Sequence, residues 1–118
     1  MATVAALIAD RVRYEEKAIL LASRRLSVPL KQIDAKNMIL ELRRKRTKEV
    51  DYDTALMRCV SFYRGLHIAA TLEGYGVKAI NSSSTSNTCG NKLLASVALE
   101  RHGVKTPRTV VAFTPEAA

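Results

Sequence analysis

Short apolar segments alternate with amphipathic helical segments in this sequence, and that alternation most limits the folds open to the chain. Residues 3–9 (TVAALIA) form an almost uninterrupted apolar run, as is typical of a strand covered on both faces of a parallel sheet. Residues 14–25 carry two glutamates in the first turn and two arginines in the last, the charge order that a helix dipole favours. Ile19, Ala22 and Leu26 have the spacing of a buried stripe, so we expect a strand, a turn and a helix.

The same pattern recurs downstream. A second helix is expected over residues 62–73, with Gly65, Ile68, Ala69 and Leu72 on its buried face. Three further apolar runs are predicted as strands: residues 30–35, 55–60 and 77–80. Strands and helices that alternate in this way predict an α/β fold with a three-layer, mostly parallel sheet of the Rossmann-like kind.

The last third of the chain is organised around Lys92. A polar, Ser/Thr-rich loop is expected over residues 81–91, and a helix that begins at Lys92 and stops at Gly103 follows it. A β-branched strand is predicted over residues 109–113. The Thr-Pro-Glu sequence at residues 114–116 is typical of a helix cap and first turn.

A dense basic run follows a segment that is harder to assign. Met38, Ile39 and Leu42 have the spacing of a short buried face, and the run comes next: Arg43, Arg44, Lys45, Arg46 and Lys48. The run either binds phosphate or acidic groups or is the solvated end of a helix, where cations are favoured in any case. The net charge of +8 favours an acidic partner, although 5% aromatic residues and no tryptophan argue against single-stranded nucleic acid.

Length and composition exclude several classes of protein. The 118 residues suffice for one ordinary domain, and no apolar run reaches the roughly 18–20 residues of a membrane span. Cys59 and Cys89 are too few for a disulfide framework, which favours a reduced, cytoplasmic setting. His67 and His102 have no clustered ligands beside them, so no metal site is predicted.

Two groups of residues are candidates for binding. Arg58, Ser61 and Arg64 follow a predicted strand, and ligands of parallel sheets gather at the carboxyl ends of strands. The two arginines could hold a substrate carboxylate through paired hydrogen bonds, whereas Ser61 is equally explained as a helix cap. Lys92, on the first turn of its helix, either meets a phosphate or is a surface lysine; neither a GxGxxG nor a GxxxxGK[ST] motif accompanies it.

An ordered set of short motifs resembles the RimK-like ATP-grasp ligases, most closely the LysX-type enzymes of lysine and arginine biosynthesis. The matching motifs are DRVR at residues 10–13 with the glutamates at 15 and 16, RCVSFYRGL at 58–66, VKAIN at 77–81, CGNKL at 89–93 and VKTPRT at 104–109. They cover nearly the whole chain in order, and the resemblance is weakest over residues 36–50. Asn91 stands where many relatives carry aspartate, so a role for that carboxylate does not transfer.

The resemblance implies a pre-ATP-grasp domain over residues 1–90 and the first helix and strand of an ATP-grasp domain over residues 91–118. It implies that Lys92 approaches the phosphates of ATP and that Mg²⁺ is required. The implied reaction activates the C-terminal glutamate of a small acidic carrier protein as an acyl phosphate, which the amine of 2-aminoadipate or glutamate then attacks. It also implies an enzyme whose relatives associate, so a homo-oligomer is an expectation.

Because other ATP and magnesium residues of such ligases have no counterpart here, we expect the 118-residue chain alone to be inactive. The sequence does not select the amine substrate. The alternative is a non-catalytic basic module that binds an acidic protein partner or nucleic acid.

Overall fold

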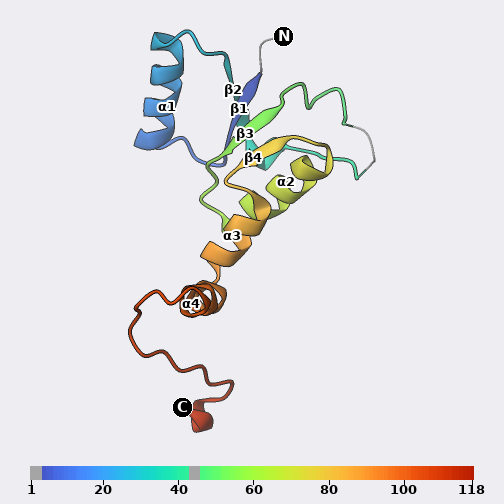
Figure 1. Ribbon diagram of the computed structural model, residues 1–118. Coiled ribbons are helices and arrows are strands. Elements are labelled where there is room, and N and C mark those ends of the chain that lie inside the picture. The colour runs from blue at the N-terminus through green and yellow to red at the C-terminus, as the bar shows by residue number, and fades with distance from the viewer. Residues whose placement is uncertain (1–3, 43–45) are drawn as a thin grey trace. The chain divides into compact units, whose positions relative to one another are not determined.

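The computed structural model describes residues 4–42 and 46–118, which divide into two compact units, Met1–Ser83 and Ser84–Ala118. The first unit is built on a four-stranded, wholly parallel sheet with the strand order β2-β1-β3-β4 (Figure 1). Its elements in chain order are β1 (Ala5–Ala9), α1 (Tyr14–Arg25), β2 (Leu30–Asp34), the short 3₁₀ helix η1 (Ala35–Asn37), β3 (Thr54–Met57), α2 (Phe62–Gly74) and β4 (Lys78–Ile80). The predicted α/β class and parallel sheet are confirmed.

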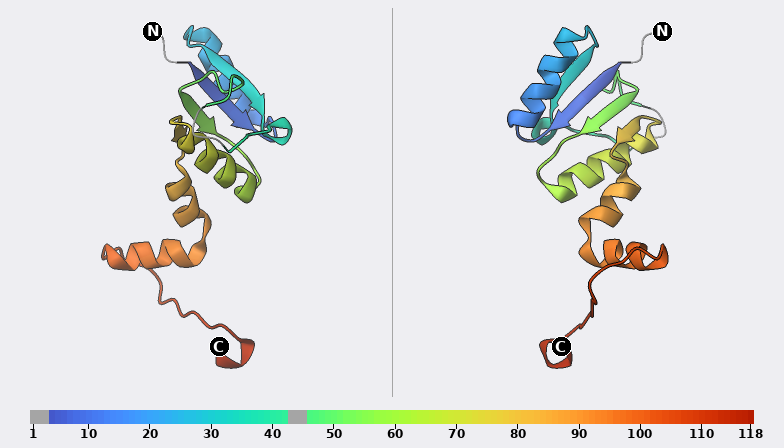
Figure 2. Two further views of the ribbon diagram at one scale, coloured as in Figure 1. Left: turned by 90° about the vertical axis from the view of Figure 1, so that its right-hand side faces the viewer. Right: turned by 60° about the vertical axis from the view of Figure 1, so that its left-hand side comes forward.

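Helices α1 and α2 lie on opposite faces of the sheet, which gives the three expected layers (Figure 2). The main core is on the α2 side, where Ala6 and Ile8 of β1 pack with Ala55 of β3 and with Ile68 and Leu72 of α2. The alternate residue of β1, Leu7, is also fully buried but lies outside that cluster. Burial of both faces explains why β1 is apolar throughout.

The strand order creates a switch point between β1 and β3. The chain leaves β1 toward α1 on one face of the sheet, and it leaves the adjacent β3 toward α2 on the other face. Two neighbouring loops therefore diverge at the carboxyl ends of these strands, the place where open α/β sheets form a ligand crevice. Ile8 pairs with Met57 at this end, and the backbone N–H of Arg58 donates to the carbonyl of Ile8 at 2.8 Å.

The buried stripe expected on α1 is wrong. Ala22 is exposed and Leu26 is 73% exposed, while Ile19 is only partly buried. The one buried residue of α1 is Glu16. Ile19, Leu20 and Ser23 are partly buried beside Glu16, so the inward face of α1 lies at other positions than the predicted spacing.

The segment after η1 is also more exposed than predicted. Met38 is partly buried against the core, but Ile39 is 91% and Leu42 is 85% exposed, so the expected three-residue face does not form. Much of the basic run, residues 43–45, lies outside the described residues. Arg46 donates from Nη1 to Oδ1 of Asp53 at 3.0 Å, so an internal partner accounts for this member of the run.

The Ser/Thr-rich segment is a helix, α3 (Ser83–Gly90), and the loop predicted there is wrong. Glu73 accepts hydrogen bonds from the backbone N–H of Ser83, at 2.8 Å, and from the hydroxyl of Ser83. A carboxylate at a helix N-terminus satisfies free N–H groups and complements the dipole, so a contact from α2 outweighs weak local helix propensity.

The second unit contains α4 (Lys92–Arg101) and the 3₁₀ helix η2 (Pro115–Ala117). Gly103 follows α4 with φ of 65°, which is the expected glycine stop, and Thr114 caps η2 as predicted. The strand predicted over residues 109–113 is wrong, since this segment is irregular. A β-branched segment needs a neighbouring strand, and the described residues of this unit contain none.

Candidate functional site

Asp10 follows the last residue of β1 and joins the two loops at the switch point. Its Oδ1 accepts from the backbone N–H of Val60 at 2.8 Å, and its Oδ2 accepts from the N–H of Ser61 at 3.0 Å. The same Oδ2 accepts from Nη1 of Arg64 at 2.7 Å. Burial acts to raise the pKa of Asp10, but these three hydrogen bonds outweigh it and lower the pKa to about 2. Asp10 is therefore a carboxylate at any physiological pH.

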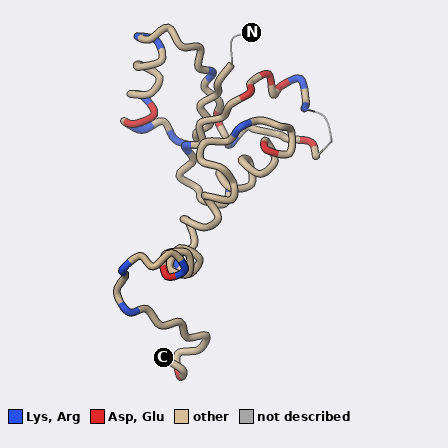
Figure 3. Tube along the Cα trace, viewed as in Figure 1, with Lys and Arg blue, Asp and Glu red and all other residues tan. Residues whose placement is uncertain are grey.

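Glu16 forms the second link between the loops. Its carboxylate accepts from the backbone N–H, Nε and Nη2 of Arg13 at 2.9, 3.1 and 3.0 Å, which caps the start of α1. It also accepts from Nε of Arg58, just beyond β3, at 2.9 Å. The hydrogen bonds from Arg13 lead the causes that lower the pKa of Glu16 to about 2, against the opposing effect of burial. Figure 3 shows acidic residues at the start of α1 and basic residues at its far end.

The structure brings the predicted residues Arg58, Ser61 and Arg64 to one edge of the sheet. The carboxylates that meet the two arginines belong to the chain itself, Glu16 and Asp10. Ser61 is the N-cap of α2, because its hydroxyl accepts from the backbone N–H of Arg64 at 3.4 Å. The capping alternative for Ser61 therefore describes its contact, and a role for the three residues in substrate binding stays a prediction.

A shallow hollow of about 420 Å³ opens beside Asp10, and most of its charge is positive. Arg11, Lys36 and Arg64 line it together with Asp10, so three cations surround one carboxylate. Arg64 is already paired, and Nζ of Lys36 lies 3.8 Å from Oδ2 of Asp34. The arrangement suits a small anion such as a carboxylate, which can meet several cations at once.

Lys36 was missed as a site residue by sequence reasoning. It lies in η1, after the strand next to β1, so it reaches the hollow from a separate part of the sequence. The parallel register of β1 and β2, which ends with Ala9 opposite Asp34, brings the two strand ends together. Sequence reasoning could not place Lys36 at the site because it did not predict the strand order. The pairing of β2 with β1 brings Lys36 close to Asp10.

Cys59 is partly buried just beyond β3, and its Sγ lies 3.9 Å from the carbonyl oxygen of Ile8. Burial is the main cause that raises the pKa of its thiol, to about 11, so the thiol stays protonated at neutral pH. A Cβ on Gly65 would lie 3.2 Å from Cβ of Cys59, so the glycine lets the first turn of α2 approach the end of β3 closely.

Lys92 is the first residue of α4 and is exposed. Asn91 precedes it as the N-cap, and its Oδ1 accepts from the backbone N–H groups of Leu93 and Leu94 at 3.0 and 3.1 Å. The amide therefore does what an aspartate would do at this cap. An exposed lysine on a capped first turn is available to an anion, which is compatible with the predicted contact to phosphate.

Neither a cluster of metal-binding side chains nor a membrane-spanning helix is found in the described part of the chain, residues 4–42 and 46–118. Within these residues, no group of three or more His, Cys, Asp or Glu is placed to hold a metal ion. No helix formed by the same residues is long and apolar enough to cross a membrane.

Comparison with known proteins identifies the family. The sequence family described as the LysX preATP-grasp domain matches residues 5–88, which contain the whole sheet and the switch-point site. The chain belongs to the LysX preATP-grasp domain family. The resemblance inferred from the short motifs is thereby confirmed, and so is the assignment of the fold.

The curated relatives of this LysX preATP-grasp chain are ligases. Glutamate–LysW ligase ArgX of Sulfurisphaera tokodaii is 41% identical over 95% of this chain and 39% of its own length, and ArgX of Sulfolobus acidocaldarius is 38% identical over 96% and 39%. Alpha-aminoadipate–LysW ligase LysX of S. tokodaii is 32% identical over 95% of this chain and 40% of its own length. The chain therefore spans about two fifths of the length of these relatives.

Proposed function

We propose that this chain is the preATP-grasp part of an ATP- and Mg²⁺-dependent ligase that joins an amino acid to the C-terminal glutamate of an acidic LysW-type carrier protein. The observation that carries the proposal is the family match over residues 5–88, combined with relatives that are ligases of this kind. Glutamate is the favoured amino acid, since the two ArgX proteins share 38 and 41% identity with the chain and three LysX proteins share 29–32%. Aminoadipate is the second candidate.

The switch-point hollow would receive a substrate carboxylate. Arg11 and Lys36 supply positive charge there, and Asp10 fixes the guanidinium of Arg64 at its edge. Because Asp10 and Glu16 keep Arg64 and Arg58 in place, the site is organised before a ligand arrives, which reduces the entropy lost on binding. In the proposed reaction these residues bind and orient the substrate.

Lys92 would approach the phosphates of ATP. Its charge stands at the N-terminus of α4, where the helix dipole also favours an anion. ATP would supply the phosphoryl group that activates the carboxylate. No magnesium ligands are assigned to this chain, because residues 4–42 and 46–118 hold no suitable cluster of acidic side chains.

The carrier protein is expected to be attracted by charge. The chain has a net charge of +8, and an acidic partner would associate faster with such a surface at low salt. A homo-oligomer and a cytoplasmic location stay predictions.

A chimeric ligase tests the proposal. This chain would replace the corresponding segment of S. tokodaii ArgX, and transfer of glutamate or aminoadipate to LysW would be followed by mass spectrometry. We expect a mass increase of one amino-acid residue that requires ATP, and Lys92→Ala should lower kcat/KM by about 100-fold through loss of a phosphate contact. Lys105→Ala, which removes an exposed lysine of the same unit, is the matched control. A folded chimera that transfers neither amino acid would refute the proposal.

The second candidate is a non-catalytic basic module for an acidic partner, which the net charge alone favours. It predicts that the 118-residue chain binds LysW as tightly as the chimera does and that the chimera does not consume ATP. Charge reversal at Arg11 and Lys36 in the chimera distinguishes the two candidates. The ligase proposal expects a raised KM for the substrate whose carboxylate enters the hollow, with ATP binding retained. The module candidate expects no ATP consumption with or without these substitutions.

A further inference from the structure

Helix α1 turns a row of apolar side chains away from the sheet. The members of this outer row recur at every fourth position and are all exposed: Tyr14, Ala18, Ala22 and Leu26. Leu21 lies beside the row and is 48% exposed. Single exposed apolar side chains are common on protein surfaces, but a row of them along one helix is typical of a surface that another molecule covers.

The outer row is bordered by positive charge that has no partner in the described chain. Lys17 and Arg24 lie two turns apart on one side of the row, and Arg25 lies at its end. Among the described residues, none forms an ion pair with these three cations. The exposed acid of the helix is Glu15, whose charge already acts on Arg13. An acidic partner therefore complements this surface better than a neutral or basic one.

The outer row begins next to the switch-point hollow. Tyr14 is the first residue of α1 and follows Arg11, which lines the hollow, by three positions in the sequence. The 12 residues of α1 extend over about 18 Å from that point. A protein that lies along α1 can therefore place the end of its own chain in the hollow.

We propose that the outer row of α1 and its three cations dock the acidic carrier protein, whose C-terminal glutamate enters the switch-point hollow. This inference rests on the proposed ligase function and adds the surface on which the carrier binds. A second copy of the chain fits less well, because it would bring the same cations and a net charge of +8. An anionic membrane also fits less well, because membrane-surface helices carry a broad face of large apolar residues, and two members of this row are alanines.

Kinetics of the ArgX chimera with LysW as the varied substrate test the docking surface. Leu21→Glu places a carboxylate beside the apolar row, so the KM for LysW should rise by about tenfold while kcat stays unchanged, as expected when binding alone is lost. Lys17→Glu should raise this KM about fivefold at low salt and about twofold at high salt, because salt screens exposed charges. The KM values for glutamate and ATP should not change.

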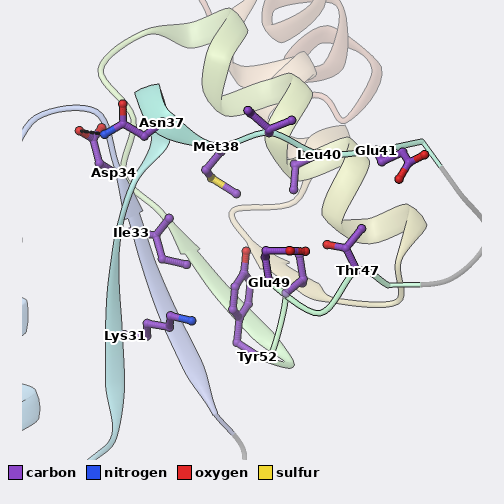
Figure 4. Close-up of a pocket in the computed structure, with 12 residues that line it drawn as sticks. Lys31, Ile33, Asp34, Asn37, Met38, Leu40, Glu41, Thr47, Glu49 and Tyr52 are labelled. Atoms are coloured by element: carbon purple, nitrogen blue, oxygen red, sulfur yellow. Dashed lines mark hydrogen bonds between the residues drawn. The ribbon is translucent and has the colours of Figure 1, made fainter.

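Matched controls make the same changes on the α2 side of the sheet. Leu42→Glu and Lys48→Glu alter exposed residues in or next to the segments 38–41 and 47–52. These segments pack against the core on the α2 side and line a separate cavity of about 670 Å³ (Figure 4). Both controls should leave the KM for LysW at the parent value, because position and not overall charge decides the docking.

Several results would overturn the docking surface. An unchanged KM for LysW in Leu21→Glu would show that the carrier binds elsewhere, and an equal rise in Lys17→Glu and Lys48→Glu would show attraction by overall charge alone. If Leu21→Glu lowers the Tm of the chimera but not that of the 118-residue chain, the rest of the ligase covers the outer row. Dimerisation of the chain in analytical ultracentrifugation that Leu21→Glu abolishes would assign the row to a second copy, and binding to phosphatidylserine vesicles that Leu21→Glu abolishes would assign it to a membrane.

Failure of the docking surface can be told apart from failure of the proposed function. A chimera that transfers glutamate to LysW, with α1 variants that match the parent, refutes the docking surface and leaves the ligase function in place. A folded chimera that transfers neither amino acid refutes the ligase function and the docking surface with it.

Discussion

Replacing Glu16 by glutamine should destabilise the first unit, because this carboxylate joins α1 to the end of β3. The side chain is fully buried and receives hydrogen bonds from Arg13 and Arg58. Its pKa falls from 4.5 to about 2, and at 1.36 kcal/mol per pKa unit the full shift corresponds to about 3 kcal/mol. The two guanidinium partners are 44 and 37% exposed, so solvent screening reduces the effect to about 1–2 kcal/mol.

The pH dependence of that loss has a definite sign. The folded pKa of Glu16 lies below the unfolded value of 4.5, so the folded state favours the ionised form. The stabilisation is complete above about pH 5 and disappears as the pH falls from 4.5 to 2. Glu16→Gln, which has no such proton to bind, should therefore differ most from the parent chain at pH 7 and least near pH 2.

Urea unfolding followed by the amide NMR signals of β1 and β3 measures this difference for the first unit alone. The expected reduction in the free energy of unfolding is about 1–2 kcal/mol at pH 7, narrowing through pH 4 and 3. Glu15→Gln removes an exposed glutamate from the same helical turn and controls for the helix dipole. A reduction that is the same at pH 7 and pH 3, or equal to that of Glu15→Gln, would refute the assigned role of the ion pairs.

Three further substitutions address packing and capping. Tyr52→Phe removes a buried unpaired hydroxyl, so the free energy of unfolding should stay level or rise by about 1 kcal/mol; a clear decrease would mean that the hydroxyl has a partner. Asn91→Ala removes the cap of α4 and should lower helicity by circular dichroism at a cost of about 1 kcal/mol, with Asn87→Ala, a substitution within α3, as the control. Gly65→Ala should destabilise by about 1 kcal/mol in thermal unfolding, because its Cβ would press on Cys59, whereas Gly74→Ala meets no atom within 4 Å.

The sequence predicted those elements whose ends carry strong local signals. Helix α1 begins and ends where its glutamates and arginines indicate, and α2 begins after Ser61 and ends at Gly74. Local chemistry at a helix end depends on neighbours in the sequence, so it can be recognised without the fold. The predicted ends of β2, β3 and β4 differ from the observed ones by one to three residues, because the apolar runs and the strand pairing do not stop at the same residues. Thr3, the first residue predicted for β1, lies outside the described residues.

The errors occurred where contacts distant in sequence decide the structure. Glu73 stabilises the first turn of α3 from the preceding helix, and no local pattern indicates that carboxylate as a cap. Residues 109–113 have β propensity but no neighbouring strand in the described part of their unit. Similarly, the sequence predicted that Arg58 and Arg64 lie at a strand end, but no local pattern indicated their ion pairs with Glu16 and Asp10.

The same pairing explains how one edge of the sheet can be polar and still be well ordered. On the α2 side, Ile68 and Leu72 hold their helix through apolar burial. On the α1 side, the buried residue of the helix is a glutamate, and its bonds to Arg13 and Arg58 join the loops that leave β1 and β3. Charged hydrogen bonds fix these loops without covering them, whereas apolar packing would close the crevice. Ion pairs therefore define the shape of the switch point, where we propose that an anionic ligand binds.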